Sequence, residues 1–407
     1  MKIALLSFEY PPETGFGGIG TYTWHHARAL AKLGHEVHVL AGAREPTPLR
    51  SSGHDGVRVH RYWAGGAAMR AFGHLGAYRL WWTRQRLQNA WSMYHGIAAL
   101  HRAHRFDVIE MPECGAEGAL ATTLLDAPTV VRLHSPSRLI MHYYDVRRAD
   151  IVLCSAIEQR ALGKASALTA CSRFVTDEVT RTLRVDRRIA VIPNGLDIEW
   201  FDAAEPVDVY SKYSLPRRQL MIVFTGRMER RKGIHLCPEI ATTILERHDV
   251  TFVLAGDDLF GYAAGTLLPA LAARSLKGSI HWLGPLPVSE LRPLVRAADV
   301  FLLPSLWENC PYSCIESMAA GRAVVAADQG GMPELIQDGV NGLLAAAGDA
   351  ASFVRRIEQL IEDPALRVRL GSAARETILR VHRDTHVARQ ALGVYQDIIA
   401  GGTGAAP

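Results

Sequence analysis

The 407-residue sequence has six cysteines, and none of them forms a Cys-x-x-Cys pair or stands at metal-ligand spacing beside a histidine. Their spacing argues against a zinc site and a disulfide framework, and reduced thiols are expected. No stretch approaches the about 18 consecutive apolar residues that would predict a membrane-spanning helix. No basic stripe with interleaved aromatic residues is present, which argues against a nucleic-acid-binding surface.

The composition is that of a globular protein, with 48% hydrophobic and 21% charged residues. A chain of 407 residues exceeds what one hydrophobic core usually organises, so we expect two domains. Residues 1–200 hold 24 Lys and Arg against 18 Asp and Glu, whereas the remainder holds 21 against 23. This mild excess of positive charge predicts that the first half meets an anionic molecule.

The first residues lack the pattern of a targeting segment. A single Lys2 and a short apolar run are followed directly by Glu9 and Pro11, which predicts a first buried strand and not a signal peptide. We therefore expect a cytoplasmic protein.

Short apolar runs bounded by Gly, Pro or Asp alternate with longer segments of helical periodicity. This alternation is typical of parallel sheets built from βαβ units, and each half holds enough runs for its own doubly wound sheet. The strands expected in the first half are residues 3–7, 36–41, 57–60, 108–110, 129–133, 167–170 and 190–192. Those expected in the second half are residues 220–224, 251–255, 280–283, 300–303 and 323–326.

The turn Pro193-Asn194-Gly195 precedes a fresh start of this pattern. We predict an N-terminal domain over residues 1–200, a C-terminal domain over 201–383, a helix over 384–400 that packs back on the first domain, and a disordered tail over 401–407. Two such domains in tandem predict a deep cleft between them, where the carboxyl ends of both sheets bind a ligand.

A glycine-rich turn, Gly15-Phe16-Gly17-Gly18-Ile19-Gly20, leads into a helical segment. Glycines allow close approach of the backbone to a phosphate, and a helix start offers free N–H groups. The turn satisfies G-x-G-x-x-G, but it does not follow the first strand at once, and the second strand ends at Arg44 without the acidic residue of a dinucleotide site. A flexible turn without a ligand is the structural alternative.

A run of cations follows the strand expected at residues 220–224, in Thr225-Gly226-Arg227-Met228-Glu229-Arg230-Arg231-Lys232-Gly233. Cations at the carboxyl end of a buried strand can hold phosphate oxygens and stabilise a leaving diphosphate. The alternative is a solvated charge run. We expect that alternative to describe Arg230 and Arg231, but not Arg227 and Lys232.

Two carboxylates follow the strand expected at residues 300–303. Glu308 lies in a loop made otherwise of Trp, Asn, Cys and Pro, and Glu316 lies in the first turn of a helix expected to begin near Ser313. Both could accept hydrogen bonds from the hydroxyls of a sugar and a ribose. Ser313-Cys314-Ile315-Glu316 is also a capping box, which would explain Glu316 without a ligand.

Together and in this order, the motifs resemble a glycosyltransferase of family 4, a retaining group with the two-domain GT-B fold, from Met1 to about Tyr395. The matching segments are Gly17-Gly18-Ile19-Gly20, Val191-Ile192-Pro193-Asn194-Gly195-Leu196-Asp197, Gly226-Arg227 with Lys232-Gly233, Ala255-Gly256-Asp257, Pro304-Ser305, Glu308 with Glu316, and Gly330-Gly331-Met332-Pro333-Glu334. The resemblance implies an α/β fold of two Rossmann-like domains. It also implies a metal-independent, retaining transfer of a hexose from a nucleotide-diphosphate sugar to an acceptor, without a cofactor.

The resemblance further implies the roles of the site residues. Arg227 and Lys232 bind the diphosphate in place of a divalent ion, and Glu308 holds the transferred sugar with His134 nearby. The other donor-binding positions are Gly17 and Gly18 at the diphosphate, Asn309, Cys310, Tyr312 and Ser313 beside Glu308, Glu316 at the ribose, and Leu283 and Gly284 at the base. Without the resemblance, a lone histidine such as His134 is more often structural.

Two positions need an interpretation of their own. Pro311 stands where the family commonly has Gly, and proline has no N–H to offer a ligand. Asp257-Asp258 is similar to the metal-binding acidic pair of other sugar transferases, but we interpret Asp257 as loop structure.

We expect the acceptor to be chosen by residues 70–105 together with His142, Tyr143 and Tyr144. Residues 70–105 carry three tryptophans among basic residues, which fits a helix with one buried and one solvated face, the interpretation we favour. It also fits a basic amphipathic helix that rests on an anionic membrane. The acceptor itself, a glycan, a lipid-linked sugar or a small metabolite, is not predicted, and neither are the base and the sugar of the donor.

Two alternatives to transfer stay open. A sugar-nucleotide-binding pseudo-enzyme would keep the same residues and show binding without turnover. A nicotinamide-dependent oxidoreductase would explain the glycine-rich turn, but it accounts for fewer of the motifs.

Overall fold

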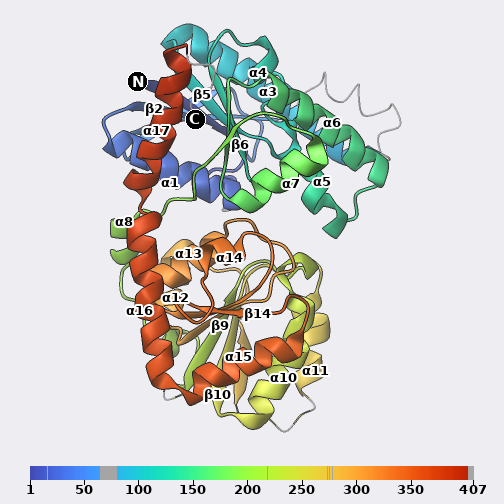
Figure 1. The fold of residues 1–407 in the computed structure, drawn as a ribbon, viewed down its shortest axis with the longest axis vertical. Helices are drawn as coiled ribbons and strands as arrows, with labels where there is room; N and C mark the ends of the chain where they lie inside the picture. The colour runs from blue at the N-terminus through green and yellow to red at the C-terminus, as the bar shows by residue number, and fades with distance from the viewer. Residues whose placement is uncertain are drawn as a thin grey trace. The chain divides into compact units, whose positions relative to one another are not determined.

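The computed structural model describes residues 1–15, 17–64, 80–217, 219–272, 274, 276 and 278–401 (Figure 1). The chain divides into two compact units. Unit 1 is Met1–Gly195 together with the chain from Asp384 on, and unit 2 is Leu196–Arg383. The division after Gly195 lies inside the Pro/Gly turn region that suggested the boundary at residue 200. The predicted tail lies outside the described residues from residue 402 on, and the predicted cleft stays a prediction.

Unit 1 contains an eight-stranded sheet in the order β3-β4-β2-β1-β5-β6-β7-β8. Its strands are β1 (Lys2–Ser7), β2 (Glu36–Gly42), β3 (Arg50–His54), β4 (Val57–Tyr62), β5 (Val108–Pro112), β6 (Thr129–Leu133), β7 (Ala167–Ala170) and β8 (Ile189–Val191). All neighbouring pairs are parallel except β3 with β4. The carboxyl ends of seven strands therefore meet at one edge of the sheet.

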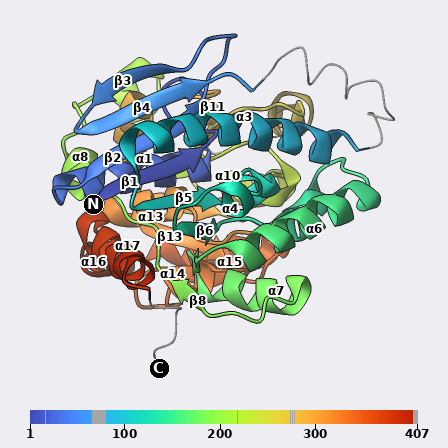
Figure 2. The ribbon, with the colours of Figure 1, turned by 90° about the horizontal axis from the view of Figure 1, so that it is seen from above.

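The helices of unit 1 cover both faces of this sheet (Figure 2). They are α1 (Gly18–Lys32), α3 (Trp81–His104), α4 (Ala121–Leu124), α5 (Ser137–Ile140), α6 (Arg148–Lys164), α7 (Arg173–Leu183) and α17 (Asp384–Ile399). On β2, Val37 and Val39 belong to the core shared with α1 and α17, whereas Leu40 lies against Gly96 of α3. This alternation explains why β2 is apolar on both faces.

The C-terminal helix α17 packs on unit 1 through a buried polar network. Tyr395 donates a hydrogen bond to Oε2 of Glu110 at 2.7 Å, and Tyr22 of α1 donates to Oε1 of the same carboxylate at 2.7 Å. His26 lies 3.0 Å from the Tyr395 hydroxyl. The segment that ends the chain thus completes the core of the segment that begins it.

Unit 2 contains a six-stranded parallel sheet in the order β11-β10-β9-β12-β13-β14. Its strands are β9 (Leu220–Thr225), β10 (Val250–Ala255), β11 (Ser279–Trp282), β12 (Val300–Leu303), β13 (Ala323–Ala327) and β14 (Leu343–Ala345). Its helices are α8 (Ile198–Asp202), α9 (Val209–Lys212), α10 (Cys237–Arg247), α11 (Leu268–Ala272), α12 (Val288–Ala297), α13 (Tyr312–Ala319), α14 (Met332–Leu335), α15 (Ala350–Glu362) and α16 (Pro364–Val381). The two doubly wound α/β units confirm the predicted fold class.

Two strands were not predicted from the sequence. The five residues of β3 are all exposed, so they lack the apolar pattern of a buried strand. Its hairpin with β4 turns at Asp55 and Gly56, which both have positive φ, as an Asp-Gly hairpin turn requires. The other strand, β14, has only three residues.

Candidate functional site

The predicted cation and carboxylate of unit 2 meet at the carboxyl edge of its sheet. Lys232 ends a short turn, Arg230–Lys232, in the connection between β9 and α10, and Glu308 lies between β12 and α13. Because β9 and β12 are neighbouring parallel strands, their following loops lie side by side. The ammonium group of Lys232 donates a hydrogen bond to Oε1 of Glu308. The side chains are 18% and 9% exposed, so the pair is largely removed from water.

Arg231 also belongs to this cluster, so the expectation that it is a solvated charge was wrong. Its guanidinium contacts Oε1 of Glu229 at 2.7 Å, donates to the carbonyl of Trp307 at 3.2 Å and lies 3.7 Å from Glu308. Arg227 was not expected to be solvated, yet half of its side chain is in solvent, and it lies 3.4 Å from Glu229. Glu229 therefore links Arg227 to the buried charges, and Arg230 is exposed as expected.

Glycines allow the two loops to approach closely. Gly233 has φ +76°, and a Cβ there would lie 1.9 Å from the carbonyl oxygen of Pro304. Gly330 and Gly331 pack in the same way against the carbonyl oxygens of Glu308 and Asn309, at 2.1 and 1.9 Å from a built Cβ. The backbone around Glu308 is thus fixed on two sides by positions that accept only glycine without rearrangement.

The charges around Glu308 favour its ionised form. Burial by itself would raise the pKa of Glu308, but the positive charges of Lys232 and Arg231 outweigh it and lower the pKa. Burial lowers the pKa of Lys232, and the charge of Glu308 opposes this change. An ionised carboxylate accepts hydrogen bonds only, so Glu308 can bind hydroxyl groups of a ligand.

The start of α13 differs from the capping box that the sequence suggested. The helix begins at Tyr312 with Pro311 at the N-cap, so Ser313 is the second helical residue and Glu316 lies beyond the first turn. The carbonyl of Pro311 accepts hydrogen bonds from Cys314 at 3.1 Å and Ile315 at 3.2 Å. Proline suits this place because its missing N–H lies outside the helical hydrogen-bond pattern.

Glu316 consequently needs another explanation than helix capping. Within the described residues its carboxylate has no hydrogen-bond or ion-pair partner, although Arg292 acts on it through its charge. Burial raises the pKa of Glu316 to about 7, and Arg292 partly offsets that rise. A half-buried carboxylate without a partner, one helix turn from the Glu308 loop, is available to a ligand.

The predicted base-binding segment follows β11 at the same edge. The N–H of Leu283 is bonded to the carbonyl of Leu254 at 2.9 Å, and the carbonyl of Gly284 accepts from the N–H of Gly256 at 2.8 Å. The Leu283 carbonyl and the Gly284 N–H have no such partner in the part of the chain that the structure describes. One acceptor and one donor therefore remain for the edge of a base.

In unit 1, Gly17 is the N-cap of α1 and Gly18 is its first residue. A Cβ at Gly18 would meet nothing within 4 Å, whereas one at Gly17 would lie 1.9 Å from the carboxylate of Glu9. Gly18 thus leaves open space in front of a helix N-terminus, as phosphate binding requires. Gly17 makes room for Glu9, a residue that the sequence did not single out.

His134 follows β6 at the carboxyl edge of the unit 1 sheet. Its backbone N–H donates to Oε2 of Glu113 at 2.8 Å, and its ring stands edge-on to Tyr22 with 5.0 Å between the centroids. Burial and, to a smaller extent, Arg132 lower the pKa of His134 well below its usual value. The imidazole is therefore neutral at neutral pH and can donate or accept one hydrogen bond.

A possible metal-binding cluster lies elsewhere in unit 1. Nitrogen and oxygen atoms of Glu36, His38 and His104 lie within 4.8 Å of one another. Glu36 is the first residue of β2, so this cluster is at the amino end of the strands, opposite to Gly18 and His134. In unit 2, Asp258 accepts hydrogen bonds from the N–H groups of residues 262–264, which is a role in loop structure.

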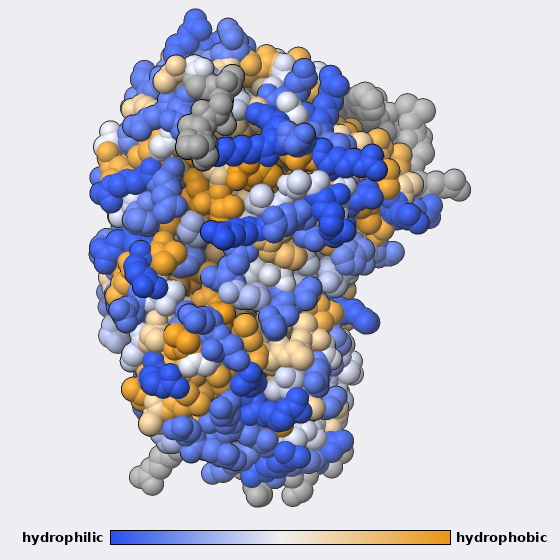
Figure 3. All heavy atoms as spheres, viewed as in Figure 1, coloured by the Kyte–Doolittle hydropathy of each residue, from blue (hydrophilic) through white to orange (hydrophobic). Residues whose placement is uncertain are grey.

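The face of the molecule drawn in Figure 3 carries many hydrophilic residues, with apolar areas among them. The helix α3 buries Trp82 but exposes Trp81, Leu87 and Trp91, which are 40, 40 and 49% exposed. Within the described residues, no helix has the length and apolar character needed to cross a membrane. The first ten residues of the segment 70–105 lie outside the described residues.

Two family models match the chain. The model described as Glycosyltransferase Family 4 matches residues 16–200, and the model described as Glycosyl transferases group 1 matches residues 219–363. The first therefore falls on unit 1 almost entirely and the second within unit 2.

Solved structures show the same fold at low sequence identity. The sucrose-phosphate synthase from Thermosynechococcus elongatus has a TM-score of 0.81 and 21% identity, over 98% of this chain and 99% of that one. The HepE protein of Anabaena, solved in complex with UDP-glucose, has a TM-score of 0.71 and 20% identity, over 98% and 100%. The two Rossmann-like units therefore belong to the GT-B fold.

Curated relatives match over nearly the whole length. The alpha-maltose-1-phosphate synthase of Mycobacterium tuberculosis is 30% identical over 98% of this chain and 100% of its own. The D-inositol 3-phosphate glycosyltransferase of Acidothermus cellulolyticus is 28% identical over 94% and 86%. With this identity over the full length and the family model on its first half, the chain belongs to glycosyltransferase family 4.

Proposed function

We propose that this glycosyltransferase moves a hexose from a nucleotide-diphosphate sugar to a hydroxyl group of an acceptor, with retention of anomeric configuration and without a divalent metal ion. The observation that carries the proposal is the cluster of Lys232, Arg231 and Glu308 at the carboxyl edge of the unit 2 sheet. This cluster places buried cations beside an ionised carboxylate. The cations can bind a diphosphate, and the carboxylate can accept hydrogen bonds from sugar hydroxyls.

The cations of this cluster bind the leaving group. Arg227, Arg231 and Lys232 carry three positive charges against the two negative charges of Glu229 and Glu308, so one positive charge remains for the diphosphate. In the reaction, the bond between the anomeric carbon and the phosphate oxygen breaks and negative charge grows on the diphosphate. Fixed cations in a site with little water stabilise that charge and take the role that a metal ion has elsewhere.

The carboxylates orient the donor. Glu308 accepts hydrogen bonds from hydroxyls of the transferred sugar, and Glu316 accepts them from the ribose diol. Leu283 and Gly284 offer one acceptor and one donor to the base, while the N-terminus of α13 with Ser313 faces the phosphates. Asn309, Cys310 and Tyr312 complete the donor-binding residues of unit 2. In unit 1, the resemblance implies that Gly17 and Gly18 contact the diphosphate and that His134 lies near the sugar.

Retention follows if the acceptor oxygen attacks the anomeric carbon from the face that the diphosphate leaves. The new bond joins the acceptor oxygen to the anomeric carbon, and the acceptor proton moves to the departing phosphate oxygen. No general base is then required. A double displacement would need a nucleophilic carboxylate at the anomeric carbon, and Glu308 is engaged by Lys232 instead.

The experiment is a donor panel with the purified chain in excess EDTA. The matching sugar nucleotide among UDP-, GDP- and ADP-glucose should raise the melting temperature, because a ligand that binds only the folded state stabilises it. NMR of the released or transferred sugar should then show the anomeric configuration of the donor. A product of inverted configuration, or a strict need for added metal, would contradict the proposed chemistry. Binding of a donor without turnover on any acceptor would favour the pseudo-enzyme.

The proposal also includes a peripheral contact between α3 and a membrane surface. Trp81, Leu87 and Trp91 are exposed apolar side chains, and Arg84 lies on the same helix between them. Sedimentation with vesicles of phosphatidylglycerol should carry the protein down, whereas phosphatidylcholine vesicles should not. Unchanged sedimentation of a Trp91→Ser variant would speak against α3 as the contact.

A further inference from the structure

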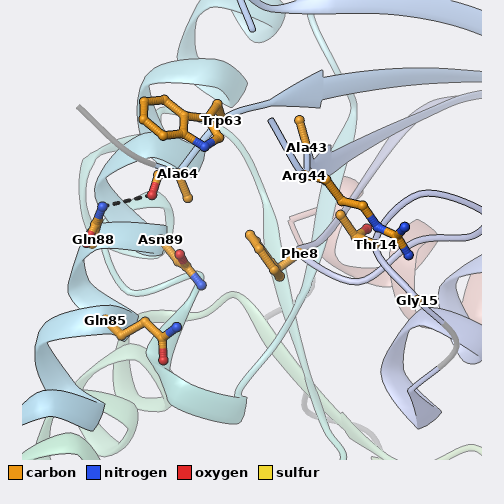
Figure 4. Close-up of a pocket in the computed structure, with 10 residues that line it drawn as sticks. All are labelled: Phe8, Thr14, Gly15, Ala43, Arg44, Trp63, Ala64, Gln85, Gln88 and Asn89. Carbon is orange, nitrogen blue, oxygen red and sulfur yellow. Dashed lines mark hydrogen bonds between the residues drawn. The ribbon is translucent and has the colours of Figure 1, made fainter. Parts of the chain in front are cut away.

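A cavity of about 460 Å³ opens at the carboxyl edge of the unit 1 sheet (Figure 4). Its walls come from the residues that follow β1, β2 and β4 and from the first turns of α3. Ligands of doubly wound sheets bind in the crevice outside the carboxyl ends of the strands, so the cavity occupies the place where a substrate of unit 1 is expected. None of its polar residues was predicted from the sequence to bind a ligand.

Asn89 is the polar group that points most directly to a ligand. The residue is 94% buried, and its amide has no hydrogen-bond partner within the described residues, although it lines the cavity. Figure 4 shows Asn89 and Gln85 extending from α3 into the cavity toward Phe8. Buried amides are nearly always hydrogen-bonded, so the partner of Asn89 is expected to be a molecule in the cavity.

The charge of the cavity selects the kind of ligand. Arg44 is the one charged residue among the described residues that line it, and no carboxylate is among them. Its guanidinium has no ion-pair partner in the described parts of the chain. The nearby Glu13 accepts the backbone N–H of Arg44 at 3.2 Å, while its carboxylate is paired with Arg50 at 2.6 Å. An arginine without an ion-pair partner at the cavity wall favours an anionic group that accepts two N–H bonds at once, such as a phosphate or a carboxylate.

Two aromatic side chains provide the apolar part. Trp63 is 37% exposed and lies at one side of the cavity, and Phe8 lies between α3 and Arg44 (Figure 4). The backbone of Phe8 is fixed, since its N–H donates to Glu117 at 3.3 Å and its carbonyl accepts from Gly42 at 3.0 Å. Gln88 donates to the carbonyl of Ala64 at 2.8 Å and so connects α3 to the segment after β4.

We propose that this cavity binds the acceptor, and that the acceptor is a hydroxylated ring of monosaccharide size that carries one phosphate or carboxylate. The inference rests on the proposed function, because it names the acceptor class of that transfer. Arg44 holds the anionic group, Asn89 and Gln85 on the opposite wall bind ring hydroxyls, and Phe8 and Trp63 cover the apolar face of the ring. The ring must therefore span the cavity between α3 and the end of β2.

The test measures binding of acceptor probes to the full chain by calorimetry, without a donor. The probes are glucose 6-phosphate, glucuronate, glucose and inorganic phosphate. A charge-assisted arginine contact and the ring contacts together should make at least one anionic hexose bind roughly tenfold tighter than glucose and than phosphate. The two anionic probes distinguish a phosphate from a carboxylate acceptor.

Three variants localise the binding. Arg44→Gln should reduce the affinity for the anionic hexose to that of glucose, and Asn89→Ala should weaken binding of the ring whether or not it is charged. Arg58→Gln is the matched control, because Arg58 is an exposed arginine on β4 that pairs with Glu36 and does not line the cavity. It should leave every affinity unchanged.

Several results would overturn the inference. Equal affinities for glucose and both anionic hexoses would remove the role of Arg44, and phosphate binding as tightly as glucose 6-phosphate would remove the role of the ring. The site would also be rejected if none of the probes showed saturable binding. It would be rejected as well if Arg58→Gln weakened binding as much as Arg44→Gln does. Failure of the proposed function is seen separately, as the absence of a melting-temperature increase with any sugar nucleotide while the acceptor probes still bind.

Discussion

The ammonium group of Lys232 and the carboxylate of Glu308 form an ion pair between loops that lie 76 residues apart in the chain. The contact arises because each residue follows a strand of the same parallel sheet, and β9 and β12 are neighbours in it. Both partners are largely buried, so their charges act in a medium that screens them weakly. This pair is the centre of the proposed donor site.

We expect Glu308→Gln and Lys232→Ala to lose transfer while the protein stays folded. The glutamine keeps the shape but removes the charge that holds the sugar and Lys232, and the alanine removes a cation at the leaving group. Losses of roughly 10²- to 10³-fold in kcat are typical of such groups. Arg230→Gln removes an exposed charge from the same turn and serves as the control. Near-normal kcat in either site variant would refute the assignment.

A second prediction concerns the close approach of the two loops at Gly233. Gly233 and Gly339 have similar φ angles of +76° and +73°, but a Cβ at Gly339 would meet nothing within 4 Å. Gly339→Ala should therefore cost only the left-handed backbone strain, about 1 kcal/mol in the free energy of unfolding. Gly233→Ala adds a collision with the carbonyl of Pro304 and should cost at least about twice as much.

Denaturant unfolding of both variants measures this difference. Gly233→Ala should also lower kcat, because Lys232 is the neighbouring residue. Equal unfolding free energies for the two variants would show that the β9–α10 connection relaxes away from Pro304 without cost.

The sequence was sufficient to predict what depends on strand order. The parallel pattern of apolar runs predicted both sheets, and residues that follow neighbouring strands, such as Lys232 and Glu308, were expected at one edge. The sequence was not sufficient where the role of a residue depends on whether its side chain is buried. Arg231 is indistinguishable from Arg230 in a charge run, yet the turn that presents Lys232 directs Arg231 inward against Glu229 and Trp307.

The cavity of unit 1 could not have been predicted in the same way. Arg44, Trp63 and Asn89 come from the ends of two strands and from one helix, and no motif connects them. The capping-box interpretation of Glu316 failed for a local reason, since Pro311 starts the helix earlier than Ser313 would. A proline before a helical run is a signal for the N-terminus that could have been used.

A third prediction concerns the pH dependence of donor binding. Burial raises the pKa of Glu316 to about 7, so the free protein holds a proton there below that pH. Ribose hydroxyls that donate to the carboxylate favour its ionised form and lower the pKa. Binding near pH 6 must then release a proton, and the donor affinity should fall as the pH decreases through about 7.

Calorimetry at pH 6.5 in buffers of different ionisation enthalpy measures the released proton. Glu316→Gln should bind the donor more weakly and should release none. Glu246→Gln, which removes an exposed carboxylate paired with Arg274, should behave as the unchanged protein does. An observed proton uptake, or a release that persists in Glu316→Gln, would contradict the role of Glu316.

The last prediction concerns the attachment of α17 to unit 1. Tyr395 and Tyr22 each donate a hydrogen bond of 2.7 Å to one oxygen of the buried Glu110. Tyr395→Phe leaves that oxygen without its donor, and the loss of a hydrogen bond to a charged group in the interior costs about 1.5–3 kcal/mol. Tyr94→Phe is the control, because the Tyr94 hydroxyl has no hydrogen-bond partner among the described residues.

The two tyrosines should not act independently. Both hydroxyls donate to the same buried carboxylate, so the two substitutions act on one hydrogen-bond network, and the free energy of unfolding of the double variant should not equal the sum of the two single effects. Hydrogen exchange should also become faster in α17 of Tyr395→Phe. The alternative outcome is additive free energies of unfolding with unchanged hydrogen exchange in α17. That outcome would mean that apolar contacts of residues such as Val387 and Ala391, and not the carboxylate of Glu110, hold the C-terminal helix on unit 1.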